Sequence, residues 1–141
     1  MKGFTLIELL LVIGGIGIIA ALTIPVGVNF YRIQVLDETA GDILVALRRA
    51  QNQAMFQKND SAFGVRFLSD SYVLFEGNSY GEVPSQDEPF NLMGGITTSG
   101  IVEVDFAKLT GIPNTTGTLT ITSGNDSQGI HINAQGKVEK N

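Results

Sequence analysis

Cysteine is absent from this 141-residue chain, and histidine occurs only once. Without a thiol there can be no disulfide framework, no cysteine nucleophile and no thiolate metal site. The single histidine, His131, falls on the outward side of a predicted strand, where exposed or hydrogen-bonded histidines are far commoner than catalytic ones. No nucleophile-elbow motif accompanies it. We therefore expect no catalytic residue, no cofactor and no enzymatic activity.

Basic side chains are also scarce. The chain has 9 lysines and arginines against 14 acidic residues, for a net charge of −5. Residues 57–141 alone carry five basic and ten acidic side chains. Nucleic-acid phosphates require clusters of lysine and arginine, and the C-terminal region offers only Lys137 and Lys140 beside Glu139. We do not expect DNA as a partner, and no small-molecule substrate is indicated either.

A metal site is not indicated by the acidic residues. Asp87 and Glu88 lie in a long, glycine-rich stretch over residues 77–100, which we predict to be an irregular loop. The spacing of the oxygen-bearing side chains there matches no EF-hand-like pattern. Glu103 and Asp105 alternate in a predicted strand and share a face, which a solvated strand explains as well as an acid–base pair does. We expect no bound metal.

Charge almost disappears between Phe4 and Val28, where Glu8 is the only ionisable side chain. About 20 apolar residues in a helix cross the hydrocarbon core of a bilayer, so this run of 25 is long enough to span it. The apolar region of a secretory signal peptide is shorter, about 7–15 residues. A simple anchor does not explain Glu8, because a carboxylate costs up to about 2.5–3.5 kcal/mol at the bilayer centre.

The start of this run reads Lys2-Gly3-Phe4-Thr5-Leu6-Ile7-Glu8-Leu9-Leu10. It resembles the leader junction of type IV prepilins and of the pseudopilins of type II secretion. The resemblance implies that a prepilin peptidase cuts between Gly3 and Phe4, and that the same enzyme methylates the new amine of Phe4. It also implies that Glu8 pairs with the terminal amine of a neighbouring subunit during assembly. Such a pair would be a charge-assisted hydrogen bond in a low dielectric.

Three residues of the apolar run weaken a helix. Gly14 and Gly15 each lower helix propensity by roughly 1 kcal/mol relative to alanine. Pro25 removes a backbone hydrogen bond and favours a kink. In the pilin family the helix can melt locally when a subunit enters the filament, and these residues would permit the same here.

Beyond Pro25 the apolar residues recur in steps of three and four, which marks one face of a helix. The face consists of Ile33, Leu36, Ala40, Ile43, Leu47, Ala50 and Ala54. Charged and polar residues occupy the opposite face: Arg32, Asp37, Glu38, Asp42, Arg48, Arg49 and Gln53. The pattern predicts that the helix continues in amphipathic form to about residues 55–57.

After Asn59 the period changes to two, which is typical of strands. Alternating segments at 63–67 and 72–75 flank a turn at 69–71 and predict a hairpin, and further strands are indicated near 102–107, 118–122, 130–133 and 138. The predicted fold class is α+β: a long N-terminal helix, membrane-spanning in its first half and amphipathic in its second, packed on a small, mostly antiparallel sheet. This is the layout of the pilin fold.

The order of elements resembles one branch of the family. The segments 47–54 and 64–67, together with the ending 129–138, are similar to the H-type minor pseudopilin of type II secretion and to related minor type IV pilins. The resemblance implies a leader at 1–3, a transmembrane assembly helix at 4–28, an amphipathic continuation at 29–56 and a β-rich head at 57–141.

The same resemblance implies a role, a place and partners. The expected function is that of a minor pseudopilin, a structural subunit that helps to initiate or cap a secretion pseudopilus. The alternative is a minor type IV pilin that acts in pilus assembly or DNA uptake. The expected location is the bacterial inner membrane, with one span, a cytoplasmic N-terminus and a periplasmic or extracytoplasmic head, and then the filament. The expected partners are the prepilin peptidase and other pilins or pseudopilins.

Overall fold

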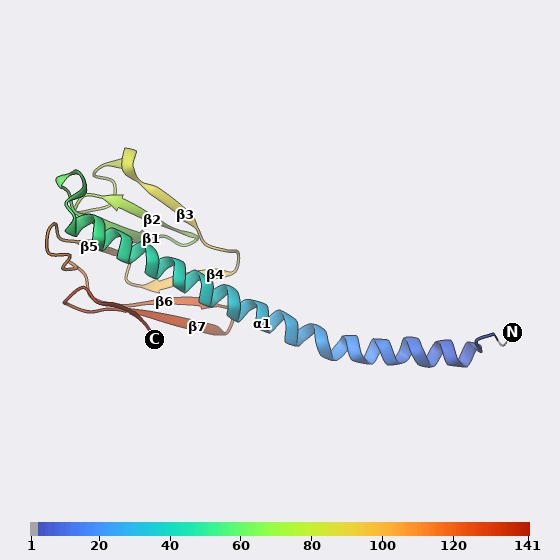
Figure 1. Cartoon of the computed structure of the whole chain (residues 1–141). Coiled ribbons are helices and arrows are strands. Elements are labelled where there is room, and N and C mark those ends of the chain that lie inside the picture. The colour runs from blue at the N-terminus through green and yellow to red at the C-terminus, as the bar shows by residue number, and fades with distance from the viewer. Residues whose placement is uncertain (1–2) are drawn as a thin grey trace. The chain divides into compact units, whose positions relative to one another are not determined.

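The computed structural model describes residues 3–141, except for the side chains of residues 24–26. The chain forms two compact units, which divide between Gln34 and Val35. One long helix, α1 (Leu6–Met55), runs through both of them (Figure 1). In the first unit every described side chain from Gly3 to Gln34 is exposed. The described residues of this unit therefore form no hydrophobic core of their own.

The second half of α1 is amphipathic, as the spacing of its apolar residues predicts. Six residues spaced by three or four are at most 4% exposed: Leu36, Ala40, Ile43, Leu47, Ala50 and Ala54. Ile33 was expected on this face and is instead 52% exposed. It precedes Val35, the first buried residue among those that the structure describes in α1, so it lies outside the core. The helix ends at Met55, close to the predicted end, and a 3-10 turn, η1 (Lys58–Asp60), follows it.

The first of two antiparallel sheets contains the predicted hairpin. Its strands are β1 (Phe63–Phe67), β2 (Ser71–Glu76), β3 (Glu88–Asn91) and β5 (Glu103–Phe106), in the order β3-β2-β1-β5. β1 and β2 pair with Phe67 opposite Tyr72, and the backbone N–H of Leu68 donates to the Ser71 carbonyl across the turn. The alternation of apolar residues at 63–67 and 72–75 is thus confirmed as a hairpin.

The second sheet holds the C-terminal strands. They are β4 (Ile96–Gly100), β6 (Gly117–Ser123), β7 (Asp126–Ile132) and β8 (Val138–Lys140), in the order β4-β6-β7-β8. β6 and β7 join through the two residues Gly124 and Asn125, and Gly124 has a φ of 62°, which glycine adopts without a steric penalty. The inward residues Leu119 and Ile130 lie opposite one another and are fully buried.

The structure differs from the expected layout in two respects. There are two four-stranded sheets rather than one. The segment 77–100 is also not an irregular loop, because it contains a 3-10 turn, η2 (Pro84–Gln86), and both β3 and β4. β3 is an edge strand that pairs only with β2, and an edge position tolerates Pro89 because one side of the strand needs no ladder bond.

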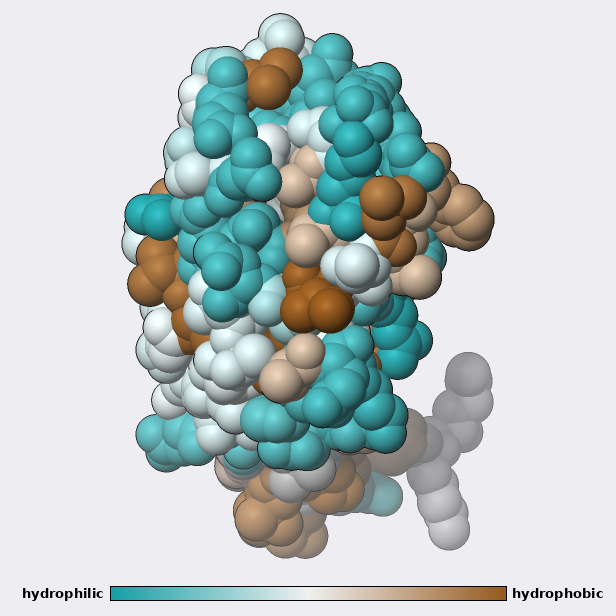
Figure 2. Space-filling view, turned by 90° about the vertical axis from the view of Figure 1, so that its left-hand side faces the viewer, coloured by the Kyte–Doolittle hydropathy of each residue, from teal (hydrophilic) through white to brown (hydrophobic). Residues whose placement is uncertain are grey.

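A single hydrophobic core holds the second unit together. Its largest fully buried side chains come from α1 and from both sheets, and they include Ile43, Leu47, Phe106 and Ile121. Figure 1 shows the second half of α1 lying across the two sheets. On the outer face of this unit that Figure 2 shows, hydrophobic side chains form small patches among hydrophilic ones. Most of the apolar side chains of the second unit therefore lie in its interior.

Gln51 ties the end of α1 to two distant loops. Its side-chain amide donates to the carbonyl of Gly111 at 2.9 Å and to that of Gly136 at 2.8 Å. A β-carbon on Gly136 would lie 2.6 Å from the Gly111 carbonyl oxygen, closer than real side chains allow. Both glycines also have positive φ angles, 64° and 81°. Glycine at these positions lets the two loops meet the helix through one side chain.

The close packing of β1 gives a stability prediction. A β-carbon on Gly64 would lie 2.6 Å from the Val104 carbonyl oxygen and 2.9 Å from the Asp105 α-carbon, which are backbone atoms of the neighbouring strand. We expect Gly64→Ala to lower the free energy of unfolding by about 1–3 kcal/mol, because the strands must separate. Chemical denaturation of the full-length protein in detergent micelles measures this change.

Gly41 provides the matched control. It lies within α1, and a β-carbon there meets no atom within 4 Å. Gly41→Ala should raise the free energy of unfolding by up to about 1 kcal/mol, because alanine has the better helix propensity. A Gly64→Ala protein as stable as the Gly41→Ala protein would contradict the packing described for β1.

Candidate functional site

The predicted cleavage site lies in an exposed, irregular segment just before α1. Gly3, Phe4 and Thr5 precede the helix and belong to no regular element, and Phe4 is 84% exposed. A β-carbon on Gly3 would meet no atom within 4 Å, so packing within the subunit does not require glycine there. The Gly3–Phe4 bond is thus sterically open to a peptidase. Met1 and Lys2 of the expected leader lie outside the described residues.

Thr5 caps the first turn of α1, a feature that the sequence analysis missed. The backbone N–H of Glu8 donates to the Thr5 hydroxyl at 3.3 Å, and that of Leu9 donates to the Thr5 carbonyl at 3.2 Å. Thr5 and Glu8 have the spacing of a capping box, in which Ser or Thr is followed three residues later by Glu or Gln. That spacing was the available signal. Glu8 also lies in the first helical turn, where its negative charge interacts favourably with the positive end of the helix dipole.

A long exposed apolar surface follows Glu8. Leu11, Ile18 and Leu22 are 71%, 67% and 69% exposed. Burying one such side chain is worth roughly 1.5–3 kcal/mol, so leaving this many in water is highly unfavourable. By its length and apolar composition, α1 can cross a membrane. Signal sequences at the N-termini of other proteins share this length and composition. The surface requires a cover, either lipid or other helices.

Gly14, Gly15 and Pro25, which were expected to weaken the helix, all lie within α1. α1 is continuous through Gly14 and Gly15, and a β-carbon on either would meet no atom within 4 Å. Pro25 lies within the bounds of α1, and its side chain lies outside what the structure describes. Local melting concerns the assembled state, so the role of these residues stays a prediction.

The ionisable residues of the β-rich region lie in separate surroundings. His131 is exposed, and its Nδ1 lies 3.2 Å from the Thr118 hydroxyl. Glu103 forms an ion pair with Arg66 at 2.9 Å, whereas Asp105 is only 9% exposed. The two carboxylates therefore have different surroundings and do not form a solvated pair. Among the residues that the structure describes, no group of three or more metal-ligating side chains comes together.

Asp105 carries an unusual carboxyl group, whose burial the sequence analysis did not predict. Burial raises the pKa of Asp105 above its ordinary value, a hydrogen bond from the Asn114 side chain lowers it, and the nearby charges of Glu103 and Glu82 raise it further. The net direction is upward. Asp105, Asn78 and Asn114 line part of a hollow of about 340 Å³.

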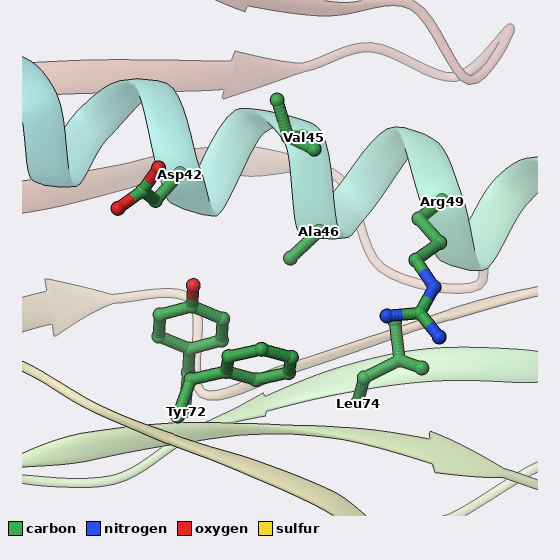
Figure 3. Close-up of a pocket in the computed structure, with 7 residues that line it drawn as sticks. Asp42, Val45, Ala46, Arg49, Tyr72 and Leu74 are labelled. Carbon is green, nitrogen blue, oxygen red and sulfur yellow. The ribbon is translucent and has the colours of Figure 1, made fainter.

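A second pocket lies between α1 and the edge of the first sheet, with a volume of about 290 Å³. It is lined by Asp42, Val45, Ala46, Arg49, Tyr72, Leu74 and Phe90. Figure 3 shows the Asp42 and Arg49 side chains toward opposite ends of the pocket, with Ala46 between them on the helix. The rings of Tyr72 and Phe90 stack at 5.1 Å between centroids. Burial and the charge of Asp42 raise the pKa of Tyr72 above its ordinary value.

Comparison of this chain with protein-family models, with curated proteins and with solved structures found no match.

The buried carboxyl of Asp105 predicts a pH-dependent difference in stability. Because its pKa is higher in the folded than in the unfolded state, the charged form opposes folding, and this penalty grows as pH rises above about 4. Asp105→Asn should remove the penalty and keep an acceptor for Asn114. We therefore expect the variant to exceed the wild type in thermal stability at pH 7, and the difference to shrink as pH is lowered to about 4. A difference independent of pH would contradict the upward shift.

Proposed function

We propose that this chain is a minor pseudopilin, a non-enzymatic subunit of a pilus-like secretion filament. The observation that carries the proposal is the arrangement at the start of α1. An exposed Gly3–Phe4 segment stands before a helix whose first turn holds Glu8 and whose residues 9–22 are all exposed and either apolar or glycine. A peptidase can cut this bond, a membrane can hold the helix, and the carboxylate can pair with a cation.

The second unit supports a structural role. Its core is complete without a partner, and five of its basic residues pair with acidic side chains: Arg49, Arg66, Lys108, Lys137 and Lys140. Paired bases on an acidic chain present no field that attracts phosphate. This disfavours the DNA-capturing role of some minor pilins. The proposed location is the inner membrane, with the head on its extracytoplasmic side, followed by incorporation into the filament.

The proposal predicts the covalent form of the mature protein. Cleavage after Gly3 removes Met1, Lys2 and Gly3, and methylation adds one methyl group to the amine of Phe4. Intact-mass analysis of the protein extracted from membranes of its native host should show both changes. A host strain that lacks the prepilin peptidase provides the control and should retain the leader. A mature chain that retains Lys2, or one cut beyond Val28, would refute the assignment.

The assembly role of Glu8 is tested by replacing its charge. Glu8→Val should insert at least as well as the wild type, because an intramembrane charge is removed. It should still be cut, because the Gly3–Phe4 bond is unchanged. Incorporation should fall more than a hundredfold, because the partner amine is left unpaired in a low dielectric at a cost of roughly 3–5 kcal/mol. Co-purification with partner pseudopilins from solubilised membranes measures incorporation.

Two further variants separate the charge from the helix cap. Glu8→Gln keeps a residue that suits the capping box but has no charge, so it should fail to assemble like Glu8→Val. Thr5→Ala removes the cap at a cost of about 1 kcal/mol but leaves the carboxylate, so it should assemble. If Glu8→Gln assembles normally while Thr5→Ala fails, Glu8 acts through the cap and the pairing role is wrong.

A further inference from the structure

Two residues of opposite charge lie on the exposed side of α1 in the second unit. Asp42 and Arg48 are both exposed, and among the residues that the structure describes neither takes part in an ion pair. Arg48 donates one hydrogen bond, to the Val138 carbonyl at 3.4 Å. A separation of six residues places the two charges about 120° apart around the helix and about 9 Å apart along it. Opposite charges on one helix meet at separations of three or four residues, so these two do not pair with each other.

The pocket of about 290 Å³ beside Asp42 has the chemistry of a cation site. Figure 3 shows Asp42 toward the Tyr72 end of this pocket and Arg49 toward the other end. Arg49 already pairs with Glu88 at 2.8 Å, so the Asp42 carboxylate is the charge that the pocket offers to a ligand. The stacked rings of Tyr72 and Phe90 supply an aromatic wall. We call this site the Asp42 pocket.

A guanidinium on an aliphatic chain matches each part of the Asp42 pocket. The planar group can pair with the carboxylate and stack on an aromatic ring, which the ammonium of lysine does less well. The aliphatic part can lie along Ala46 and Val45, and Val45 is 64% exposed although it is apolar. A purely apolar ligand would instead desolvate the carboxylate without pairing it. The pocket therefore favours an arginine side chain.

Arg48 of a second copy can supply this side chain. Five basic residues of the second unit pair with acids, as described above, and Lys58 lies over the Phe63 ring at 5.5 Å from its centroid. Arg48 is the remaining basic residue of that unit. Val45 lies midway between Asp42 and Arg48, three residues from each, so the two charges occupy opposite flanks of the exposed side. When two parallel helices lie side by side, the Asp42 flank of one faces the Arg48 flank of the other.

The shift between two such helices agrees with the proposed pairing of Glu8. Pairing of Glu8 with the Phe4 amine of a neighbour displaces one copy by four residues, or about 6 Å, along the helix. The copy that supplies Glu8 then brings its Arg48 level with Leu44 of the other copy, which is two residues, or about 3 Å, beyond Asp42. An arginine side chain spans such a difference. Both contacts therefore require parallel chains and a similar shift.

We propose that the Arg48 guanidinium of one copy occupies the Asp42 pocket of a second, parallel copy. The parallel direction rests on the proposed function, in which residues 4–28 of both copies are anchored in the same membrane. The contact is heterologous, because each copy offers its Arg48 to one neighbour and its pocket to another. It requires only two copies, so it suits a subunit of low abundance as well as a repeated one.

Disulfide trapping tests the geometry, because the chain has no cysteine of its own. Glu38 lies on the flank of Asp42 and Gly41 on that of Arg48, and the proposed shift brings them level in two copies. Full-length Glu38→Cys and Gly41→Cys chains with tags of different size, expressed together in the native host, should form mainly the mixed dimer on mild oxidation of its membranes. Each variant alone should form less dimer, because equal positions do not face one another.

The control for trapping is an exposed position away from α1. Ser127→Cys on β7, paired with Gly41→Cys, gives the background from other collisions. The proposal is overturned if the mixed dimer does not exceed this background, or if either variant alone forms as much dimer as the mixture does.

Charge reversal tests the complementarity in the same mixed dimer. Asp42→Arg in the Glu38→Cys chain should lower the dimer about tenfold, because two arginines then meet. Arg48→Asp in the Gly41→Cys chain should lower it similarly. Both changes together should restore the dimer, because each chain then carries the charge that its partner lacks. Asp126→Arg in the Glu38→Cys chain changes the net charge as Asp42→Arg does and should have no effect. Failure of the double reversal to restore the dimer would refute the ion pair.

Leader cleavage, measured by mass in the same membranes, separates this contact from the proposed function. Chains that are cut after Gly3 but give only background dimer would overturn the Arg48 contact and leave the proposed function standing. Chains that remain uncut would overturn the proposed function, and with it the parallel arrangement on which the contact rests.

Discussion

The change in surface along α1 is the constraint on which the rest of the structure depends. Up to Gln34 every described side chain is exposed, and most are apolar as far as Val28. From Val35 a single stripe is buried, and the other faces carry charge. Ala40, Ala50 and Ala54 are fully buried on that stripe, and such small side chains let sheet residues come near the helix axis. Larger side chains such as Phe106 and Ile121 then fill the core, as dense packing requires.

The buried stripe of α1 and the hairpin of β1 and β2 could be predicted, because each depends on residues close together in the sequence. Steps of three and four between apolar residues identified the buried stripe of α1, and alternation identified the hairpin of β1 and β2. β3 and β4 could not be found in the same way. Pro89 and the glycines around Met93 obscure the alternation, and these short strands exist because β2 and β6 offer them partners. The division into two sheets likewise depends on pairings between distant segments, which a period along the chain does not specify.

The candidate site was predictable to a similar degree and for the same reason. Gly3, Phe4 and Glu8 are neighbours in sequence, so their spacing could be compared directly with the junction of a known family. The Thr5 cap was equally local, and its spacing to Glu8 could have been read. Asp105 is different, because its surroundings come from Glu82, Glu103 and Asn114. Only the folded chain brings these together. The pocket of Asp42 and Arg49 is also assembled from α1, β2 and β3.

The cap and the proposed pairing compete to explain Glu8, and their magnitudes separate them. A carboxylate in the first turn of a helix gains about 0.3–1 kcal/mol from the helix dipole. Placing it in the centre of a bilayer costs about 2.5–3.5 kcal/mol, and less toward the interface. The cap alone therefore does not offset the cost once the helix is drawn into lipid or into a bundle of apolar helices. A full positive charge does, through a short hydrogen bond in a low dielectric. Cleavage after Gly3 would create such a charge at Phe4, four residues before Glu8. Within the proposed function, proteolysis then does more than remove a leader, since it supplies the cation that a neighbouring carboxylate requires.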